Sequence, residues 1–250
     1  MNTAPVLEVC GLSGGYREKN VFGGRGKEQE VLHDVSFTLY RGEILGLVGE
    51  SGTGKTTLCR LILGLQPPSA GTVRIMPPPD RPGALPQMIF QDPASALNPA
   101  FSVRRILEEP LKLAKVPAAG REAKILEMLA LTGMDPECLS RQPAQLSGGQ
   151  RQRVCIAAAL LAEPTLLLAD EPVSALDVTV QAQVLSLLRS LRQKLELSML
   201  FISHDLGVVA RLCDRVLVMK DGRIVEQGEI GSVFQNPQHP YTQRLLADSL

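Results

Sequence analysis

The chain has 250 residues, 44% of them hydrophobic and 21% charged, which fits one large globular domain or a domain that carries an inserted subdomain. The 26 basic and 26 acidic side chains cancel, so the composition argues against a strong charge-driven attraction to nucleic acid or to an anionic membrane. The five cysteines are odd in number, widely spaced and without a C-x-x-C pair, which argues against a disulfide framework and against a zinc site.

Short apolar or alternating runs predict the strands of the first third of the chain. A Gly-rich, charged surface loop is expected over residues 17–30, and an amphipathic helix over 57–65. Residues 66–86 are rich in Pro and Gly and predict a loop around short strands at most. The expected strands cover residues 6–9, 35–39, 43–48, 72–75 and 88–90.

The middle of the chain, residues 92–145, becomes mostly helical and reads as an inserted subdomain. Beyond it, helices and strands alternate, which predicts an α/β fold with a mostly parallel sheet. We therefore expect one domain over 1–250, with its core in 1–91 and 146–250. The later elements are helices 149–161 and 178–195, strands 165–169 and 199–203, and a hairpin of 215–219 and 223–226 around Asp221-Gly222.

Nothing in the sequence predicts a membrane span. Residues 1–9 lack the basic stretch and apolar stretch of a signal peptide. The longest apolar run, residues 154–162, is shorter than the roughly 20 residues that a bilayer requires. We expect a soluble chain that reaches a membrane through a partner.

A glycine-rich loop lies between a predicted strand and a predicted helix. It matches G-x-x-x-x-G-K-[ST], and its backbone N–H groups and helix start can hold phosphates. We expect Lys55 to reach the β- and γ-phosphates of ATP, and Thr56 to bind Mg²⁺. The alternative is a glycine-rich turn without a ligand. The candidate nucleotide-binding residues here are Gly49, Glu50, Ser51, Gly52, Thr53, Gly54, Lys55, Thr56 and Thr57.

Two acidic residues follow the buried strand at 165–169. Asp170 is placed to hold the magnesium shell, and Glu171 is placed to polarise an attacking water. Many strands end in acidic residues, so the pair alone is a weak signal. The phosphate loop upstream is what favours a catalytic interpretation of Asp170 and Glu171.

A second possible phosphate-binding loop opens the helix at 149–161. Its sequence is Leu146-Ser147-Gly148-Gly149-Gln150, in which Ser147 can cap the helix and the glycines leave N–H groups bare. An ordinary helix cap is the alternative. The first site has no evident room for this loop, so we expect the working enzyme to be a pair of subunits.

These segments occur in the order found in ATP-binding-cassette ATPases, which the chain resembles over essentially its whole length. The series runs from the phosphate loop through Gln91, L-S-G-G-Q, the Asp-Glu pair and Ser174-Ala175-Leu176-Asp177 to His204. The resemblance implies a P-loop NTPase core with a mostly parallel sheet, an N-terminal antiparallel β subdomain and an inserted α-helical subdomain. It also implies ATP hydrolysis coupled to transport.

The resemblance further implies that two ATP molecules lie between two head-to-tail subunits. Gln91 would then contact Mg²⁺ and the attacking water, His204 would hold the γ-phosphate, and Tyr16 would stack on adenine. For Tyr16 and His204, an ordinary surface position is the alternative. Binding across the interface is implied for Ser147, Gly148, Gly149, Gln150 and Asp177.

Four stretches resemble the importer ATPases for dipeptides, oligopeptides and nickel. They are residues 90–93, 96–99, 177–183 and 236–242, the last reading N-P-Q-H-P-Y-T, while 106–110 resembles the second ATPase of such systems. The resemblance implies a heterodimer with a sister ATPase, with a homodimer as the alternative. It also implies two transmembrane permease subunits, an extracytoplasmic substrate-binding protein and a peripheral position at the cytoplasmic face of the membrane.

The cargo stays open among peptides, nickel and other metal chelates. Many peptide-importer ATPases carry a cysteine cluster beyond the position of Tyr241, which is not seen here, so we expect no iron–sulfur cluster and lean towards nickel or a metal chelate. The alternative functions are a cassette ATPase of DNA repair or translation and a regulatory module that binds nucleotide without hydrolysis. A GTPase or kinase is disfavoured, because no N-K-x-D segment is present.

Overall fold

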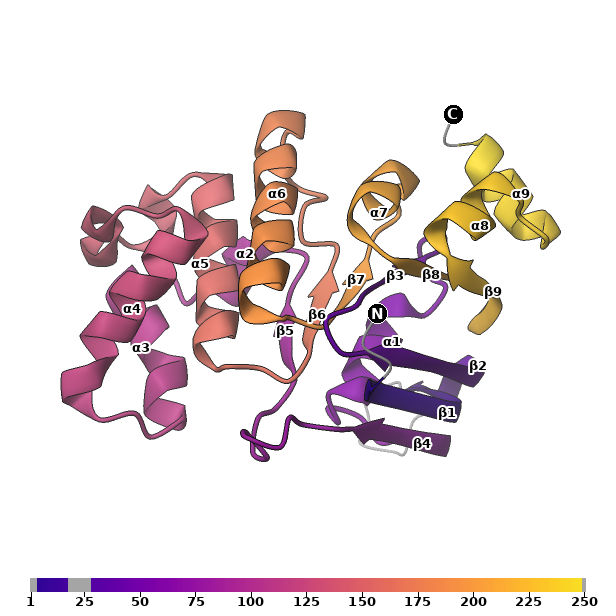
Figure 1. Ribbon diagram of the computed structural model, residues 1–250, viewed down its shortest axis with the longest axis horizontal. Coiled ribbons are helices and arrows are strands. Elements are labelled where there is room, and N and C mark those ends of the chain that lie inside the picture. The colour runs from indigo at the N-terminus through magenta and orange to yellow at the C-terminus, as the bar shows by residue number, and fades with distance from the viewer. Residues whose placement is uncertain (1–3, 18–27, 249–250) are drawn as a thin grey trace, which may run out of the picture. The chain divides into compact units, whose positions relative to one another are not determined.

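The computed structural model describes residues 4–17 and 28–248 (Figure 1). Most of the loop expected over 17–30 lies outside the described residues, and its two ends belong to strands. The chain divides into two units: one contains the chain up to Met76 and from Ser198 onwards, and the other is Pro77–Leu197. In the described ranges, no helix combines the length and the apolar character that crossing a bilayer requires.

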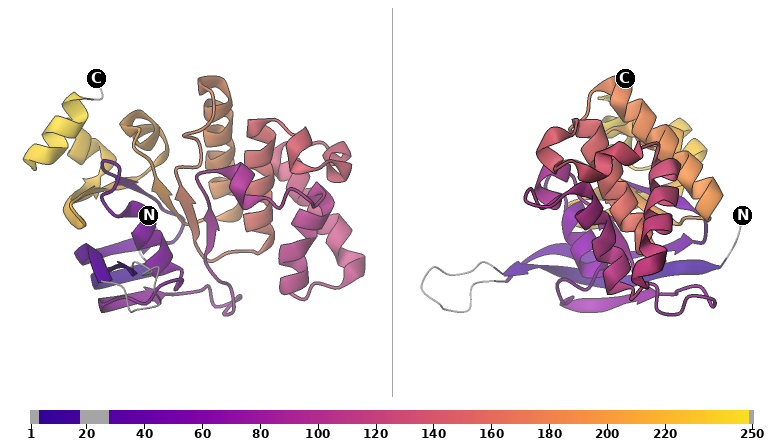
Figure 2. Two further views of the ribbon diagram at one scale, coloured as in Figure 1. Left: turned by 180° about the vertical axis from the view of Figure 1, so that it is seen from behind. Right: turned by 90° about the vertical axis from the view of Figure 1, so that its left-hand side faces the viewer.

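An antiparallel three-stranded sheet forms one part of the first unit. It contains β1 (Pro5–Arg17), β2 (Glu28–Tyr40) and β4 (Ala70–Ile75), with β1 in the middle. Figure 2 shows β1 and β2 running beside each other over most of their length. This sheet confirms the expected N-terminal antiparallel β subdomain.

The first two strands are longer than the sequence pattern indicates. The alternation stops after Val9, but β1 continues to Arg17 because the register shifts repeatedly between Val9 and Gly15. Such bulges absorb extra residues without ending the ladder. The strand predictions over 6–9 and 35–39 were therefore correct in place and too short.

A second sheet in the first unit is mostly parallel. The strand β3 (Ile44–Val48) lies between β7 (Met199–Ile202) and β8 (Arg215–Lys220) and is parallel to both, while β9 (Arg223–Glu229) pairs antiparallel with β8. Every residue of β3 and β7 is buried, which explains why these strands read as unbroken apolar runs. The helices of this unit are α1 (Lys55–Ile62), α7 (Leu206–Leu212), α8 (Ile230–Gln235) and α9 (Pro240–Ala247).

A buried ion pair joins the strands of the first unit near the beginning of β3. The Glu43 carboxylate, 8% exposed, lies 3.0 Å from Nη1 of Arg215 and also accepts a hydrogen bond from the N–H of Tyr40 at 2.7 Å. Arg215 donates to the carbonyl of Thr38 at 3.2 Å and lies over the Tyr40 ring. Each polar group of Glu43 thus has a partner, which is what burial of a charge requires.

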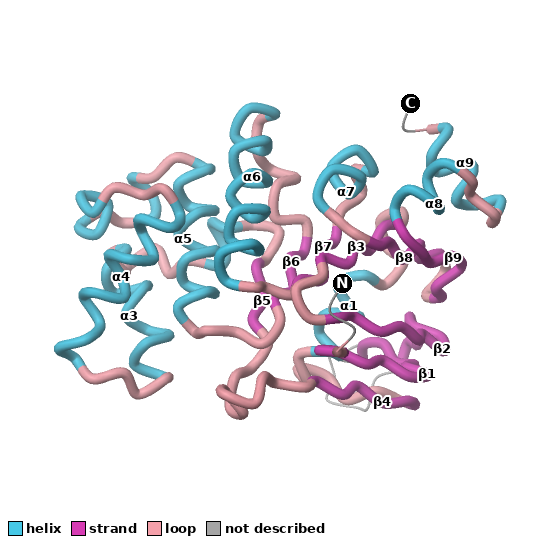
Figure 3. The backbone as a smooth tube through the Cα atoms, viewed as in Figure 1, coloured by secondary structure: helices cyan, strands magenta, loops and turns pink. Residues whose placement is uncertain are grey.

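The second unit is mostly helical. Its two strands, β5 (Gln87–Ile89) and β6 (Leu167–Asp170), form a parallel pair, and the proline-rich stretch before β5 is a loop, as predicted (Figure 3). Helix α5 (Gly148–Leu161) packs against four other helices and β5. The other helices are α2 (Pro93–Ala96), α3 (Val103–Leu113), α4 (Ala118–Thr132) and α6 (Val178–Leu195), with 3₁₀ turns η1 (Pro136–Ser140) and η2 (Pro143–Gln145).

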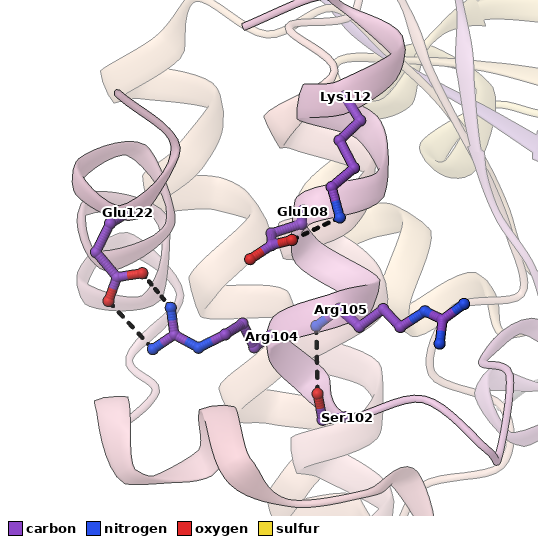
Figure 4. Close-up of polar contacts among 6 residues, drawn as sticks. All are labelled: Ser102, Arg104, Arg105, Glu108, Lys112 and Glu122. Carbon is purple, nitrogen blue, oxygen red and sulfur yellow. Dashed lines mark hydrogen bonds and ion pairs between the residues drawn. The ribbon is translucent and has the colours of Figure 1, made fainter. Parts of the chain in front are cut away.

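Polar contacts on the surface of α3 and α4 are drawn in Figure 4. Arg104 of α3 binds Glu122 of α4, and Lys112 lies 2.6 Å from Glu108 one helical turn away. The hydrogen bond from Lys112 holds the pKa of Glu108 below its ordinary value. Ser102 caps α3 by accepting the N–H of Arg105 at 3.4 Å. Because these side chains are largely in water, each pair stabilises the helices only slightly.

Candidate nucleotide-binding site

The phosphate loop joins the buried strand β3 to helix α1. Within the loop, the N–H and the hydroxyl of Thr53 both donate to the carbonyl of Glu50, at 3.4 and 2.9 Å. The cap residue of α1 is Gly54, which makes no side-chain cap hydrogen bond. A helix start without a side-chain cap presents N–H groups and a positive dipole end to an anion.

Two glycines of the loop lie against neighbouring strands. A Cβ at Gly49 would lie 2.3 Å from the carbonyl oxygen of Met219 at the end of β8. A Cβ at Gly54, which has φ +104°, would lie 2.6 Å from Cδ2 of Leu32 on β2. The loop is therefore packed closely against β8 and β2, and it can follow this path only because glycine has no side chain.

Lys55, the first residue of α1, is buried inside the loop with 7% of its surface exposed. Its ammonium group donates to the carbonyls of Gly49 and Glu50, both at 2.8 Å. A buried cation beside a helix start that has no side-chain cap provides the charge and the donors that bind phosphate oxygens.

His204 lies at the same edge of the sheet as the phosphate loop. Ile202 of β7 is paired with Leu47 of β3, and the N–H of Ser203 donates to the Leu47 carbonyl at 3.3 Å. Because parallel strands end at a common edge, both β3 and β7 deliver their following loops there. The imidazole of His204 is exposed. Tyr16 lies near the end of β1 with 42% of its surface exposed, so its ring is accessible to a planar ligand.

In the second unit, the ends of β5 and β6 bring two predicted site residues together. Asp170 ends β6 and is 5% exposed. The next residue, Glu171, has φ +45°, a left-handed conformation that costs a non-glycine residue energy and is enriched at functional sites. Gln91, which follows β5, donates a hydrogen bond of 3.1 Å from Nε2 to Oε2 of Glu171.

Helix α5 begins with a reciprocal cap. The Ser147 hydroxyl oxygen accepts from the N–H of Gln150 at 3.3 Å, and Oε1 of Gln150 accepts from the N–H of Ser147 at 3.0 Å. Both Ser147 and Gln150 therefore help to form the helix start, and this is the role that an ordinary helix cap would have. Ser147 and Gly148 are nonetheless exposed, and the hydroxyl proton of Ser147 can still be donated to a ligand.

The first turn of α6 and the segment before it lie against this helix start. A Cβ at Gly149 would lie 2.5 Å from Cγ1 of Val180, and one at Gly148 would lie 3.5 Å from Cδ2 of Leu176. Asp177 caps α6 by accepting the N–H of Val180 at 3.0 Å. The structure thus brings Asp177 and the residues 147–150 into one region of the second unit.

One residue at the phosphate loop was not among the predicted site residues. The hydroxyl of Tyr241, on α9, accepts a hydrogen bond of 3.1 Å from the N–H of Glu50. The sequence did contain a signal, since Tyr241 belongs to the N-P-Q-H-P-Y-T segment. The segment alone does not predict this contact, because Glu50 and Tyr241 are 191 residues apart along the chain.

This arrangement defines a P-loop nucleotide-binding protein: a buried strand, a glycine loop, and a helix that starts without a side-chain cap and carries a buried lysine. Comparison with known proteins identifies the family within this class. Residues 32–174 match the family described as ABC transporter. The chain belongs to the ABC transporter family and is an ATP-binding cassette of that family.

The curated relatives include ATP-binding proteins of peptide transport. The chain is 42% identical over 260 residues to the oligopeptide transport ATP-binding protein OppF of Haemophilus influenzae, covering 98% of the chain and 78% of OppF. It is 43% identical to the dipeptide transport ATP-binding protein DppF of the same organism, covering 97% and 77%. It is 48% identical over 228 residues to the uncharacterised ABC transporter ATP-binding protein YejF of Escherichia coli, covering 87% of the chain but 43% of YejF.

Solved structures confirm the fold. CbiO1 of Clostridium perfringens, part of an ABC transporter complex, matches with a TM-score of 0.78 at 27% identity, covering 93% of this chain and 92% of CbiO1. A dimeric ATP-binding cassette in a post-hydrolysis state, bound to ADP and Pi, matches with a TM-score of 0.75 at 26% identity, covering 90% and 98%.

Proposed function

We propose that this ATPase powers the import of peptides through a separate membrane permease. The proposal is carried by the relatives OppF and DppF, whose names specify oligopeptide and dipeptide transport and which align with nearly the whole chain. The sequence alone favours nickel or a metal chelate, whereas these relatives favour peptides, so nickel and metal chelates become the alternative cargo.

The proposed nucleotide contacts start from the phosphate loop. Lys55 binds the β- and γ-phosphates, with N–H groups of residues 49–57 around them, and Tyr16 stacks on adenine. Oxygens of Thr56, Gln91 and Asp170 hold Mg²⁺. This donor set fits magnesium, which takes few protein ligands and completes its shell with phosphates and water. Within residues 4–17 and 28–248, no group of three or more His, Cys, Asp and Glu that could hold a metal ion is found.

The proposed hydrolytic step uses Glu171 as the general base for the attacking water. Gln91 orients the Glu171 carboxylate through the hydrogen bond between them, and His204 holds the γ-phosphate. Mg²⁺ held by Thr56, Gln91 and Asp170 would neutralise charge on the transferring phosphate.

The proposed active enzyme is a dimer in which each phosphate loop is completed by residues 147–150 of the partner subunit. Two features support this: the exposed start of α5 with its available Ser147 hydroxyl, and the dimeric state of a solved relative. Asp177 would help to position His204 across that interface. A sister ATPase is the proposed partner, with a second copy as the alternative.

The full system would contain two transmembrane permease subunits and an extracytoplasmic binding protein, with this chain peripheral at the cytoplasmic face of the membrane. Residues 92–145 form the proposed helical subdomain that contacts the permease, while 1–91 and 146–250 form the core. The alternative, a cassette of DNA repair or translation, predicts co-purification with DNA or ribosomes in place of membrane proteins.

Complementation between two inactive variants tests the shared site. If two copies of this chain pair, Lys55→Ala and Ser147→Ala should each lack ATPase activity, whereas their mixture should regain activity, because one pocket then combines an intact loop with an intact partner helix. A mixture of two separately prepared Lys55→Ala samples is the control. A Lys55→Ala plus Ser147→Ala mixture as inactive as its components, beside an active parent, would contradict the shared site.

The cargo is tested with the permease reconstituted in vesicles. ATP-dependent uptake of a labelled oligopeptide, absent with Glu171→Gln, is the expected result. Uptake of nickel without uptake of peptides would overturn the peptide assignment and leave the ATPase assignment intact.

A further inference from the structure

The N-P-Q-H-P-Y-T segment, residues 236–242, contacts the phosphate loop through Tyr241. We propose that this segment fixes the phosphate loop, with Tyr241 as the positioning residue that holds the peptide group between Gly49 and Glu50. The inference rests on that loop being the nucleotide site.

Tyr241 contacts the loop at its first peptide group. The phenol, on a residue that is 6% exposed, accepts the Glu50 N–H at 3.1 Å. The carbonyl of the same peptide group, Gly49 C=O, accepts a hydrogen bond from Nζ of Lys55 at 2.8 Å. Because a peptide group is planar, one rotation of that plane would break both hydrogen bonds. Tyr241 and Lys55 therefore hold opposite sides of one peptide group.

This arrangement matters when phosphate arrives. Lys55 must turn part of its hydrogen bonding towards phosphate oxygens, which weakens its hold on the Gly49 carbonyl. The hydrogen bond from Glu50 to Tyr241 does not involve the lysine, so it keeps the peptide group in place during that exchange. A preorganised loop loses less conformational entropy on binding.

The rest of the segment places the tyrosine. The Glu226 carboxylate on β9 accepts the N–H groups of Gln238 and His239, at 2.8 and 3.1 Å. Nδ1 of His239 accepts the N–H of Tyr241 at 3.1 Å and so caps α9. Pro240 occupies the first position of α9, where a missing N–H costs nothing. The segment is thus a helix start that is tied to β9 and directed at the loop.

The Tyr241 phenol accepts the Glu50 N–H in its neutral form. Burial raises the pKa of Tyr241, and the hydrogen bond from Glu50 opposes this only in part. The phenol is therefore neutral at physiological pH. Lys220 lies over its ring with Nζ 5.2 Å from the centroid, a cation–π contact that restrains the ring.

The test removes the hydroxyl and keeps the ring. Tyr241→Phe should weaken ATP binding to the purified chain about two- to tenfold, the effect of losing one hydrogen bond, as measured with a fluorescent ATP analogue and by calorimetry. The KM for ATP should rise by the same factor with little change in kcat, and the Glu50 amide should exchange with solvent faster. Tyr40→Phe, which removes a hydroxyl at the end of β2, is the matched control and should change neither affinity nor exchange.

A second variant tests the path from β9 to the loop. Glu226→Gln should weaken ATP binding in the same direction as Tyr241→Phe, and the double variant should be no weaker than Tyr241→Phe alone, since Glu226 acts through Tyr241. Parental affinity in Tyr241→Phe, an equal loss in Tyr40→Phe, or additive losses in the double variant would overturn the proposal. Lys55→Ala distinguishes a failure of the proposed nucleotide site from a failure of the proposed role of Tyr241. If Lys55→Ala binds ATP like the parent, the assignment of the nucleotide site is wrong.

Discussion

The side-chain amide of Gln91 donates a hydrogen bond to the carboxylate of Glu171 over 3.1 Å. These residues are 80 positions apart in the sequence and meet because each follows a strand of the parallel pair β5 and β6. The contact fixes the orientation of the Glu171 carboxylate at the end of β6. Gln91 is therefore suited to aim the proposed base as well as to contact magnesium.

Glu171→Gln removes the base and keeps its shape. The new amide can still accept the hydrogen bond from Gln91, so the strand end should be unchanged while ATP hydrolysis falls by about 10²–10⁴-fold. ATP binding should persist, because the phosphate loop is intact. Steady-state phosphate release and nucleotide binding measure the two effects, with the surface variant Glu108→Gln as control. Hydrolysis at the parental rate would show that Glu171 is not the base.

Gly49→Ala should distort the phosphate loop. Its Cβ would lie 2.3 Å from a backbone oxygen of β8, so either the loop or the strand must move, at a cost of about 1–3 kcal/mol. We expect ATP affinity to fall by about tenfold, since 1.4 kcal/mol is one factor of ten. Gly83→Ala, with open space around its Cβ, should bind ATP normally. Equal affinity in the two variants would mean that the loop adapts freely.

Glu43→Ala should destabilise the first unit by about 2–3 kcal/mol, because it leaves the Tyr40 N–H and the Arg215 guanidinium with a lost acceptor in a mostly buried place. Urea denaturation followed by circular dichroism measures the change in the free energy of unfolding. Glu108→Ala, which breaks an exposed pair with Lys112, is the control and should cost less than about 1 kcal/mol. A loss at Glu43 no larger than the loss at Glu108 would contradict the importance of burial.

Glu226 predicts a pH dependence for the docking of α9. Burial would raise the pKa of Glu226, but the hydrogen bonds that its carboxylate accepts, the one from the Gln238 N–H first among them, outweigh burial and hold that pKa below its ordinary value. Because the folded pKa is lower than the unfolded value of about 4.3, the stabilisation is present above the unfolded pKa and is lost as pH falls through the folded pKa.

The measurement is the difference in thermal stability between the parent and Glu226→Gln as pH is lowered. This difference should be constant near neutral pH and shrink in acid. A difference that grows on acidification would reverse the assigned sign.

Elements made of apolar runs with clear ends were predictable from the sequence. The helix expected at 178–195 is α6 (Val178–Leu195), and the strand expected at 43–48 is β3 (Ile44–Val48). Buried parallel strands and long amphipathic helices carry their pattern in adjacent residues, so a local signal suffices. The phosphate loop was predictable for the same reason, as its function depends on eight consecutive residues.

Features that depend on distant segments were not predictable. Helix α1 starts at Lys55 and ends at Ile62, two or three residues earlier than expected over 57–65, because the loop lysine itself begins the helix and no cap residue marks the start. The hydrogen bonds from Gln91 to Glu171 and from Glu50 to Tyr241 join positions that only the fold brings together. No periodicity in the sequence encodes such pairs.

The Asp221-Gly222 turn between β8 and β9 has a practical consequence for anyone who wants to label this protein. In the sequence it reads as an exposed hairpin tip, the usual choice for a tag or a fluorophore. In the structure, the Gly222 carbonyl accepts the N–H of His33, and a Cβ at Gly222 would lie 1.9 Å from the Val31 carbonyl oxygen. Val31 in turn lies against Gly54 of the phosphate loop. An epitope inserted there would displace β2, which contacts both this turn and Gly54 of the phosphate loop. A label should therefore be attached elsewhere on the chain.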